Sequence, residues 1–197
     1  VSPGEVVALV WPGDRIDARL DKQIQDAFQV GKQRTPTQDL VYAINQLVEM
    51  AVRAMSPAIN DPFTAMTCLD HIGDGVARFA REVKGTPYFY DRNGQLRVIF
   101  EPVHFVELLS AAFDMLRHAS CDNASVLLHM LDVIDGIGQE VKSAEARQAL
   151  LRQVGLIQAE SQAGGLIEQD RQRSQLSGDA LRLKMAGAED FKNIEGR

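Results

Sequence analysis

The chain has 197 residues, of which 45% are hydrophobic and 24% are charged, and its formal net charge is −6. These values are typical of one globular domain with at most a small appendage, and they argue against a disordered or membrane-embedded chain. The acidic balance and the absence of a stripe rich in lysine and arginine predict no nucleic-acid partner and no direct lipid binding by this segment.

The first 14 residues are predicted to be the end of a small β module. The apolar run from Val6 to Trp11 predicts a short buried strand, which the following proline and glycine interrupt. Asp14 is expected to cap a first helix over about residues 15–30, where apolar residues recur at every fourth position.

Two helices joined by a tight connector are predicted next. Thr35 to Gln38 combines a capping hydroxyl, a proline at the first helical position and a glutamine that can reach back to the cap, so a helix is expected from there to about Met55. Asp61-Pro62 starts the following helix in the same way. The expected core positions of the two helices are Leu40, Ile44, Leu47, Val48, Ala51 and Met55, and then Phe63, Met66, Leu69, Ile72, Val76, Phe79 and Val83.

The rest of the chain predicts a β-hairpin and further helices. Asn93-Gly94 separates two apolar, strand-forming stretches, which predicts a hairpin at about residues 88–100. Three amphipathic helices are expected at about residues 102–119, 123–141 and 144–162.

The predicted fold class is mainly α. A bundle of about six helices is expected over residues 15–162, with one small β-hairpin and the short N-terminal strand. Residues 163–197 are more polar, which predicts a peripheral helix or a partner-binding arm. The closing Ile194-Glu195-Gly196-Arg197 matches a common engineered protease-cleavage site, with a natural origin as the alternative.

Cysteine usage and hydropathy bear on the compartment. Cys68 and Cys121 stand in no recognisable pattern, which favours free thiols in a reducing compartment, with a single disulfide as the alternative. No stretch approaches the roughly 20 apolar residues that span a bilayer, and no signal peptide opens the chain, so any membrane anchor is expected to lie outside it.

Three segments carry a resemblance to a known family. They are Arg34 to Asp39, Gln46-Leu47 and Arg53 to Ala65, and the last contains the unusual string Ser-Pro-Ala-Ile-Asn-Asp-Pro-Phe-Thr-Ala. The chain resembles a family of predicted membrane proteins, domain of unknown function 2254, with weaker similarity extending from Pro3 to Arg171. The resemblance implies a preceding region with several membrane-spanning helices, which would be a partner of this chain, and implies no known activity. Together with the free cysteines it favours the cytoplasmic side of the inner membrane.

The polar residues of these segments are the candidate ligand-binding or docking residues. They are Arg34, Asp39, Gln46, Arg53, Ser56, Asn60, Asp61 and Thr64. In the favoured interpretation they are architectural: Asp61 caps a helix, Asn60 adopts a left-handed conformation and Arg53 bonds the last carbonyls of the preceding helix. A docking surface comes second, and a small-anion site at the helix start comes third, because Asp61 places negative charge where an anion would sit.

Catalytic, metal and cofactor sites have little support. His71, His104 and His129 could each pair with a carboxylate on its own helix, and no spacing typical of a zinc or iron site occurs. No nucleophile elbow, phosphate-binding loop or dinucleotide fingerprint is present, so no cofactor and no catalytic residue are predicted.

We therefore expect an accessory, regulatory or assembly domain of a polytopic membrane protein that forms homo-oligomers and acts through protein contacts. The alternative is a ligand-sensing or enzymatic domain with a polar site at the corner from Ser56 to Thr64.

Overall fold

The computed structural model describes residues 6–28, 39–82, 87–100 and 103–195, with side chains in the last helix as far as Gly187. The chain divides into two compact units, Val1–Arg34 and Thr35–Arg197. Helices dominate both units, so the mainly α fold class is confirmed.

The first unit contains a short 3-10 turn, η1 (Gly13–Arg15), and one helix, α1 (Ala18–Ala27). Asp17 caps α1, because its carboxylate accepts a hydrogen bond of 2.7 Å from the backbone N–H of Leu20. The predicted cap, Asp14, lies within η1 instead. The helix therefore begins at Ala18 rather than at residue 15, since Asp17 is the residue with extended backbone and a usable acceptor.

The predicted buried strand near the N-terminus is not formed. Residues 6–10 have no regular secondary structure and are exposed, and Leu9 and Trp11 are each 91% exposed. A strand needs a neighbour that pairs with its backbone, and the described residues of this unit supply only helical turns. The apolar run alone did not determine a strand, so this prediction is wrong.

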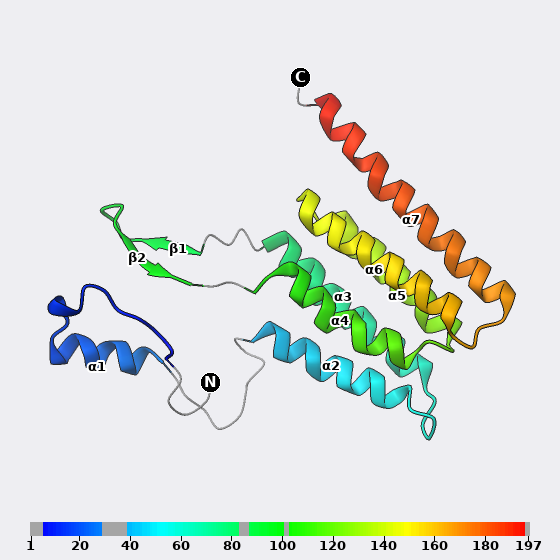
Figure 1. Ribbon diagram of the computed structural model, residues 1–197, viewed down its shortest axis with the longest axis horizontal. Helices are drawn as coiled ribbons and strands as arrows, with labels where there is room; N and C mark the ends of the chain where they lie inside the picture. Colours follow the sequence, from blue (N-terminus) through cyan, green and yellow to red (C-terminus); the bar gives the residue numbers. More distant parts are fainter. Residues whose placement is uncertain (1–5, 29–38, 83–86, 101–102, 196–197) are drawn as a thin grey trace. The chain divides into compact units, whose positions relative to one another are not determined.

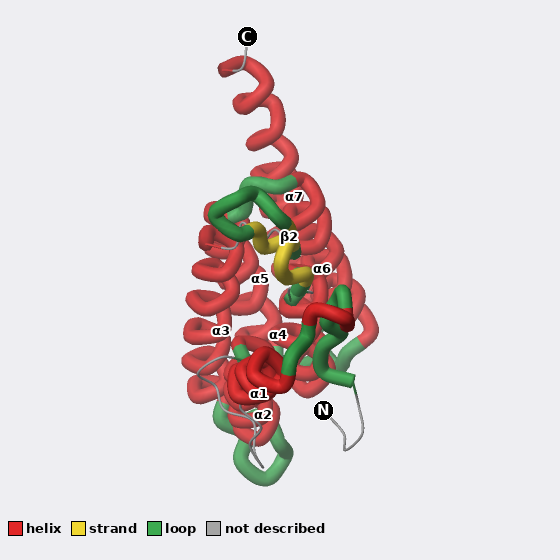
Figure 2. Tube along the Cα trace, turned by 90° about the vertical axis from the view of Figure 1, so that its left-hand side faces the viewer, coloured by secondary structure: helices red, strands yellow, loops and turns green. Residues whose placement is uncertain are grey.

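The second unit is built on helices whose axes lie roughly along one direction (Figures 1 and 2). Their bounds are α2 (Leu40–Ala54), α3 (Pro62–Glu82), α4 (Phe105–Ala119), α5 (Ala124–Glu140), α6 (Ala144–Ala163) and α7 (Glu168–Glu195). α3 packs against α2, α4 and α5, while α6 packs against α4, α5 and α7. α2 and α7 thus lie on opposite sides of the bundle, and α3 to α6 form its middle.

The helix α2 begins later than its sequence signal predicts. Residues 35–38 lie outside the described part of the chain, but Asp39 has an extended backbone, with φ −117° and ψ 92°. Its carboxylate accepts a hydrogen bond of 2.9 Å from the amide of Tyr42. A continuous helix from Pro36 is therefore wrong, because Asp39 itself is the cap.

One continuous core joins the helices of this unit. The predicted face of α2 is confirmed, with Ile44, Val48 and Ala51 buried and the other members packed against the core. The largest fully buried side chains are Phe113, Ile44, Leu69, Ile72, Leu108, Leu109, Leu116, Leu127, Met130, Ile134, Ile137 and Leu150.

One predicted core residue, Phe63, is 76% exposed, and Val83 lies outside the described residues. Phe63 belongs to the first turn of α3, directly after the connector. Helical periodicity identifies the face of a helix but not how far its neighbours extend along it, which is why the prediction failed at this end.

The predicted hairpin is confirmed. It consists of β1 (Tyr88–Tyr90) and β2 (Leu96–Ile99), which pair antiparallel with an irregularity after Phe89. Gly94 has a φ of 75°, the left-handed conformation that its sequence signal predicts. The opposed residues are Tyr88 with Ile99, Phe89 with Val98, and Tyr90 with Leu96.

The polar C-terminal segment forms α7, which covers α5 and α6. Ser174, Leu181 and Met185 are buried on its inner side. Cys68 and Cys121 are both free, as predicted, and burial raises the pKa of the Cys68 thiol. Within the described ranges, no helix combines the length and apolar character needed to cross a bilayer.

Candidate functional site

Backbone hydrogen bonds fix the connector between α2 and α3. The carbonyl of Ser56 accepts from the amides of Ile59 and Asn60 at 3.0 and 2.9 Å, and the amide of Asp61 donates to the carbonyl of Ala54 at 2.8 Å. Asn60 has a φ of 47°, in the left-handed region that asparagine tolerates better than most residues. The predicted tight connector and the left-handed Asn60 are both confirmed.

Asp61 caps the third helix through Thr64. Its Oδ1 accepts from the Thr64 amide at 3.1 Å, and its Oδ2 accepts from the Thr64 hydroxyl at 2.6 Å. Both hydrogen bonds stabilise the charged carboxylate and so lower the pKa of Asp61. The bond from the Thr64 hydroxyl contributes most to this shift. The capping role is confirmed. The same carboxylate occupies the start of the helix, so the geometry gives no support to an anion site there.

The predicted role of Arg53 is wrong. Its guanidinium donates a hydrogen bond of 2.6 Å to Glu49, one turn earlier on α2, rather than to the last carbonyls of the helix. Both side chains are more than half exposed, so this ion pair is of the surface kind and is worth little.

The remaining candidate residues are not gathered at the corner. Asp39 caps the opposite end of α2, and at about 1.5 Å per residue the 15 residues of this helix separate the two ends by about 22 Å. Gln46 is exposed near the middle of α2, and Arg34 lies outside the described residues. The structure therefore brings together only Ser56, Asn60, Asp61 and Thr64, with Arg53 one turn away.

The corner presents apolar side chains to solvent. Ile59 is 55% exposed and Phe63 is 76% exposed, although both belong to a segment whose backbone is held by hydrogen bonds. The polar groups of this segment thus have local structural roles, whereas its two large apolar side chains contribute little to the core. We call Ile59 and Phe63 the corner tip.

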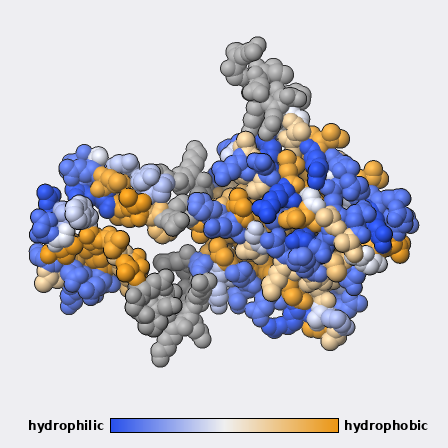
Figure 3. All heavy atoms as spheres, in the orientation of Figure 1, coloured by the Kyte–Doolittle hydropathy of each residue, from blue (hydrophilic) through white to orange (hydrophobic). Residues whose placement is uncertain are grey.

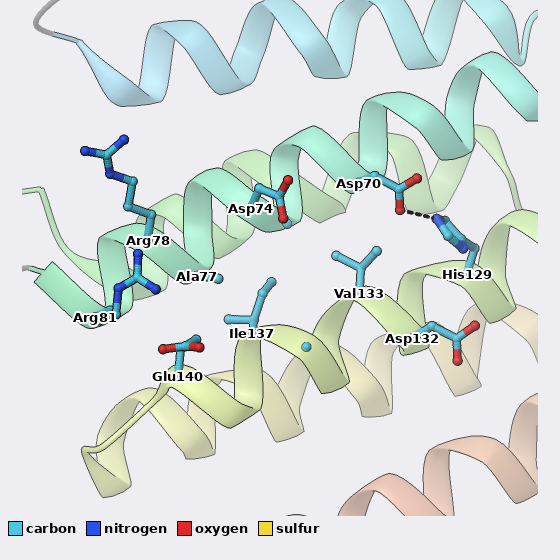
Figure 4. Close-up of a pocket in the computed structure, with 12 residues that line it drawn as sticks. Asp70, Asp74, Ala77, Arg78, Arg81, His129, Asp132, Val133, Ile137 and Glu140 are labelled. Atoms are coloured by element: carbon cyan, nitrogen blue, oxygen red, sulfur yellow. Dashed lines mark hydrogen bonds and ion pairs between the residues drawn. The ribbon is translucent and has the colours of Figure 1, made fainter.

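A groove between α3 and α5 is a second candidate, and the sequence analysis did not identify it. Asp70 faces His129, 59 residues later, and Gly73 faces Val133, 60 residues later, so the two helices run parallel. The groove has a volume of about 600 Å³. Figure 4 shows side chains from both helices along it.

Charged residues line this groove unevenly. The carboxylates are those of Asp70, Asp74, Asp132 and Glu140, and the cationic groups are Arg78 and Arg81. Figure 4 shows Arg81 and Glu140 at one end of the groove and Asp70 and His129 at the other. Carboxylates outnumber guanidinium groups, so the groove is suited to an amine or another hydrogen-bond donor rather than to an anion.

His129 bridges the two helices. Its Nε2 lies 2.7 Å from Oδ1 of Asp70 on α3, whereas the sequence pointed to a carboxylate on the histidine's own helix. The pairing of α3 with α5 supplies a partner that helical spacing alone does not reveal. No three histidine, cysteine or acidic side chains among the described residues are arranged to hold a metal ion.

The groove left a weak signal in the sequence. Gly73, Ala77 and Gly136 line it, and such small residues allow two helices to approach closely. The spacing of these residues did not show that α3 packs against α5, so a groove formed by both helices could not be predicted from the sequence.

The comparisons with known proteins agree with the resemblance carried by the corner. Residues 1–136 match the model of a family described as "Predicted membrane protein (DUF2254)". An uncharacterised protein of Mycobacterium bovis, and one from each of two Mycobacterium tuberculosis strains, are 28% identical to the chain over 142 residues. The matched part covers 72% of this chain but 27% of each relative, so the chain spans about a quarter of their length. No solved structure matches the chain significantly.

Proposed function

Because the chain belongs to the DUF2254 family of predicted membrane proteins, we propose that it is an extramembrane accessory, regulatory or assembly domain of a polytopic membrane protein. It acts through protein–protein contacts, and its partners include the membrane-spanning region of its own protein. Free thiols at Cys68 and Cys121 favour the cytoplasmic side of the membrane.

The observation that carries this proposal is the corner tip. In the segment from Ser56 to Ala65, which carries the resemblance to the family, Asp61 and Thr64 bond to each other and Asn60 completes the turn. The side chains of Ile59 and Phe63 are exposed. A rigid loop with exposed apolar side chains loses little conformational entropy on binding, which favours a docking role over ligand chemistry. We assign the corner tip to contact with the membrane-spanning region.

A cross-linking experiment on the full-length protein tests this assignment. A photoreactive phenylalanine analogue replaces Phe63 in one sample and Leu183, which is 75% exposed on α7, in the matched control. We expect cross-links from position 63 to membrane-spanning segments of the same protein, and none from position 183. Cross-links from both positions, or only to unrelated proteins, would exclude a specific docking role for the corner tip.

Membrane fractionation tests the other half of the proposal. The full-length protein is expected to stay in the membrane pellet after carbonate extraction, since spanning helices resist that treatment. Release into the supernatant would exclude a polytopic protein.

Ligand sensing is a second candidate function, favoured by the α3–α5 groove and not by the corner. The groove has a volume of about 600 Å³, which lies within the range of small-molecule sites, and the carboxylates that line it suit an organic amine. Linear diamines are suitable probes. We expect them to raise the melting temperature of the wild type more than that of Asp74→Asn, and an equal shift in both would argue against a site at Asp74.

A further inference from the structure

The last helix, α7, is anchored by few apolar side chains. Among its described side chains, Leu181 and Met185 are the large apolar ones that are buried, at 6% and 5% exposure. The other two, Leu176 and Leu183, are 70% and 75% exposed. Along the edge of the bundle that α7 forms, Figure 3 shows apolar side chains scattered among hydrophilic ones. The helix therefore gains little from apolar burial, because it exposes as many large apolar side chains as it buries.

The neighbouring helix α5 shows the contrast. It has six apolar side chains that are at most 2% exposed: Val126, Leu127, Met130, Leu131, Ile134 and Ile137. Among the described residues, the largest fully buried side chains all belong to α2, α3, α4, α5 and α6. The core of the bundle therefore depends on these helices and little on α7.

Two cavities lie between α5 and α7. They have volumes of about 180 Å³ and 200 Å³, and Asp135 of α5 and Lys184 of α7 border both. Leu181 lines the first cavity and Met185 lines the second. Each apolar anchor of α7 thus has unfilled space beside it, so it makes fewer van der Waals contacts than a side chain in a closely packed core.

Two polar groups of α7 are buried without a partner. The hydroxyl of Ser174 and Nε of Arg171 are shielded from solvent, and neither forms a hydrogen bond with the described part of the chain. An unpaired buried polar group costs free energy, which hydration would recover. These two groups therefore favour release of α7 into water.

The polar contacts that hold α7 are replaceable by water. Gln158 of α6 donates to the carbonyl of Gln175 at 3.0 Å and to Oδ1 of Asp179 at 3.1 Å. Nζ of Lys184 lies 2.6 Å from both carboxylate oxygens of Asp135, in an ion pair whose side chains are 56% and 34% exposed. Such contacts contribute little net stability, because both partners are solvated once they separate.

The position of α7 is nevertheless specific. A Cβ atom added at Gly138 of α5 would lie 2.5 Å from Cε of Met185, and one at Gly155 of α6 would lie 2.9 Å from Nη2 of Arg182. A Cβ atom at Gly178 of α7 would collide with a side chain of α6. Glycines on all three helices thus allow a close approach, and we call the surface of α5 and α6 around Gly138 and Gly155 the seat of α7.

We propose that α7 is a releasable arm, which leaves its seat as one unit while α2 to α6 stay folded. The connector of residues 164–167 begins with Gly164 and Gly165, whose conformational freedom suits a hinge. Release uncovers the surface of α5 around Leu131, which lines the first cavity. The fold thereby contains two states that differ in access to the seat. This inference goes beyond the proposed function, because it concerns a change within the domain and does not involve the corner tip.

Hydrogen–deuterium exchange, measured by mass spectrometry, tests the release. Without packing partners a helix loses most of its protection, since its stability comes mainly from tertiary contacts. The amides from Ser174 to Met185, which exclude the ends of α7, should exchange at least about 10-fold faster than those of α3. Their exchange should also respond less steeply to urea, because release exposes less surface than global unfolding does.

A variant in the core distinguishes release from global unfolding. Ile72 of α3 is fully buried, and Ile72→Val is mild enough to leave the bundle folded. It should accelerate exchange in α3 and leave α7 unchanged, because Ile72 stays packed when α7 is released. Equal acceleration in both helices, or equal exchange rates of α3 and α7 in the wild type, would overturn the proposal.

A matched pair of variants on α7 tests the seat itself. Leu181→Ala removes a buried anchor and should accelerate exchange of α7, whereas Leu183→Ala removes an exposed side chain of the same kind and should have no effect. An effect of similar size from both variants would show that α7 opens without using its seat, which would also overturn the proposal. None of these outcomes bears on membrane association, so the proposed function is tested separately.

Discussion

Gly73 on α3 faces Val133 on α5 so closely that a Cβ atom added to the glycine would lie 2.5 Å from Cγ1 of the valine. The two helices therefore meet at this point. Farther along α5, a Cβ atom at Gly136 would meet nothing within 4 Å, and the groove is open there. One close contact thus sets the spacing of the helices that form the groove.

Replacing Gly73 should force these helices apart. We expect Gly73→Ala to lower the free energy of unfolding by about 1–3 kcal/mol, the usual cost of overpacking a buried contact. Gly75→Ala is the matched control, because a Cβ atom there meets nothing within 4 Å. It should be neutral or stabilise by up to about 1 kcal/mol, since alanine favours a helix more than glycine does. Urea unfolding followed by circular dichroism measures both, and equal effects would contradict the close contact.

The ion pair between Arg117 and Glu160 should contribute far more than its surface counterpart. Arg117 on α4 is 8% exposed and bonds to Glu160 on α6, which also lies 3.1 Å from His118. Glu160→Ala leaves a buried guanidinium without its main partner, so a loss of about 3–5 kcal/mol in unfolding free energy is expected. The exposed pair of Arg53 and Glu49 is the control.

For that control, Arg53→Ala should change the unfolding free energy by less than about 1 kcal/mol. Similar losses in the two variants would show that the α4–α6 pair is not shielded from water. Denaturant titrations of both proteins in the same buffer make the comparison.

Two apolar residues of α3 should differ sharply in their contribution to stability. Leu69 is fully buried and Phe63 is 76% exposed, although the sequence predicted both for the core. Leu69→Ala should cost about 2–5 kcal/mol, whereas Phe63→Ala should stay within about 0.5 kcal/mol. A large loss from Phe63→Ala in the isolated chain would show that the corner tip packs internally and would remove the basis of its docking role.

The cap at Asp61 predicts a pH dependence. Its pKa in the folded chain is lowered from 3.8 by the hydroxyl and amide of Thr64, so charged Asp61 stabilises the fold above the unfolded-state pKa. This contribution is lost as the pH falls through the lowered pKa. Asp61→Asn keeps a capping side chain but removes the charge. The wild type should therefore be more stable than the variant near neutral pH, and the difference should shrink below about pH 4.

The urea midpoints of the two proteins over an acid pH series measure this difference. A gap that stays constant into the acid range would mean that the charge of Asp61 is not favoured by folding.

Local signals in the sequence determined most of the helices and the corner. The recurrence of apolar residues at every third or fourth position identified α3 to α6 within a few residues, and Asn93-Gly94 located the hairpin. The corner was predictable because all its stabilising groups lie close together in the chain: Asp61 bonds to Thr64, and Ser56 bonds to Asn60. The N-terminal strand was predicted wrongly because its apolar run has no strand to pair with in the described part of that unit. The starts of α1 and α2 were predicted too early because Asp17 and Asp39 are the residues that cap these helices.

The groove was not predictable for a different reason. Asp70 and His129 are 59 residues apart, and each had a plausible partner on its own helix. The close approach of Gly73 to Val133 can be recognised only once α3 and α5 are placed side by side.

The sequence by itself determined the family, the helical character and the hydrogen bonds within the corner, because these depend on residues a few positions apart. Only the tertiary structure decided which helices pair, that Phe63 is exposed while Leu69 is buried, and that the hairpin exposes both faces. The physical reason is that burial is a property of the packed neighbours of a residue, and those neighbours are chosen by the summed contacts of the whole bundle rather than by any local pattern.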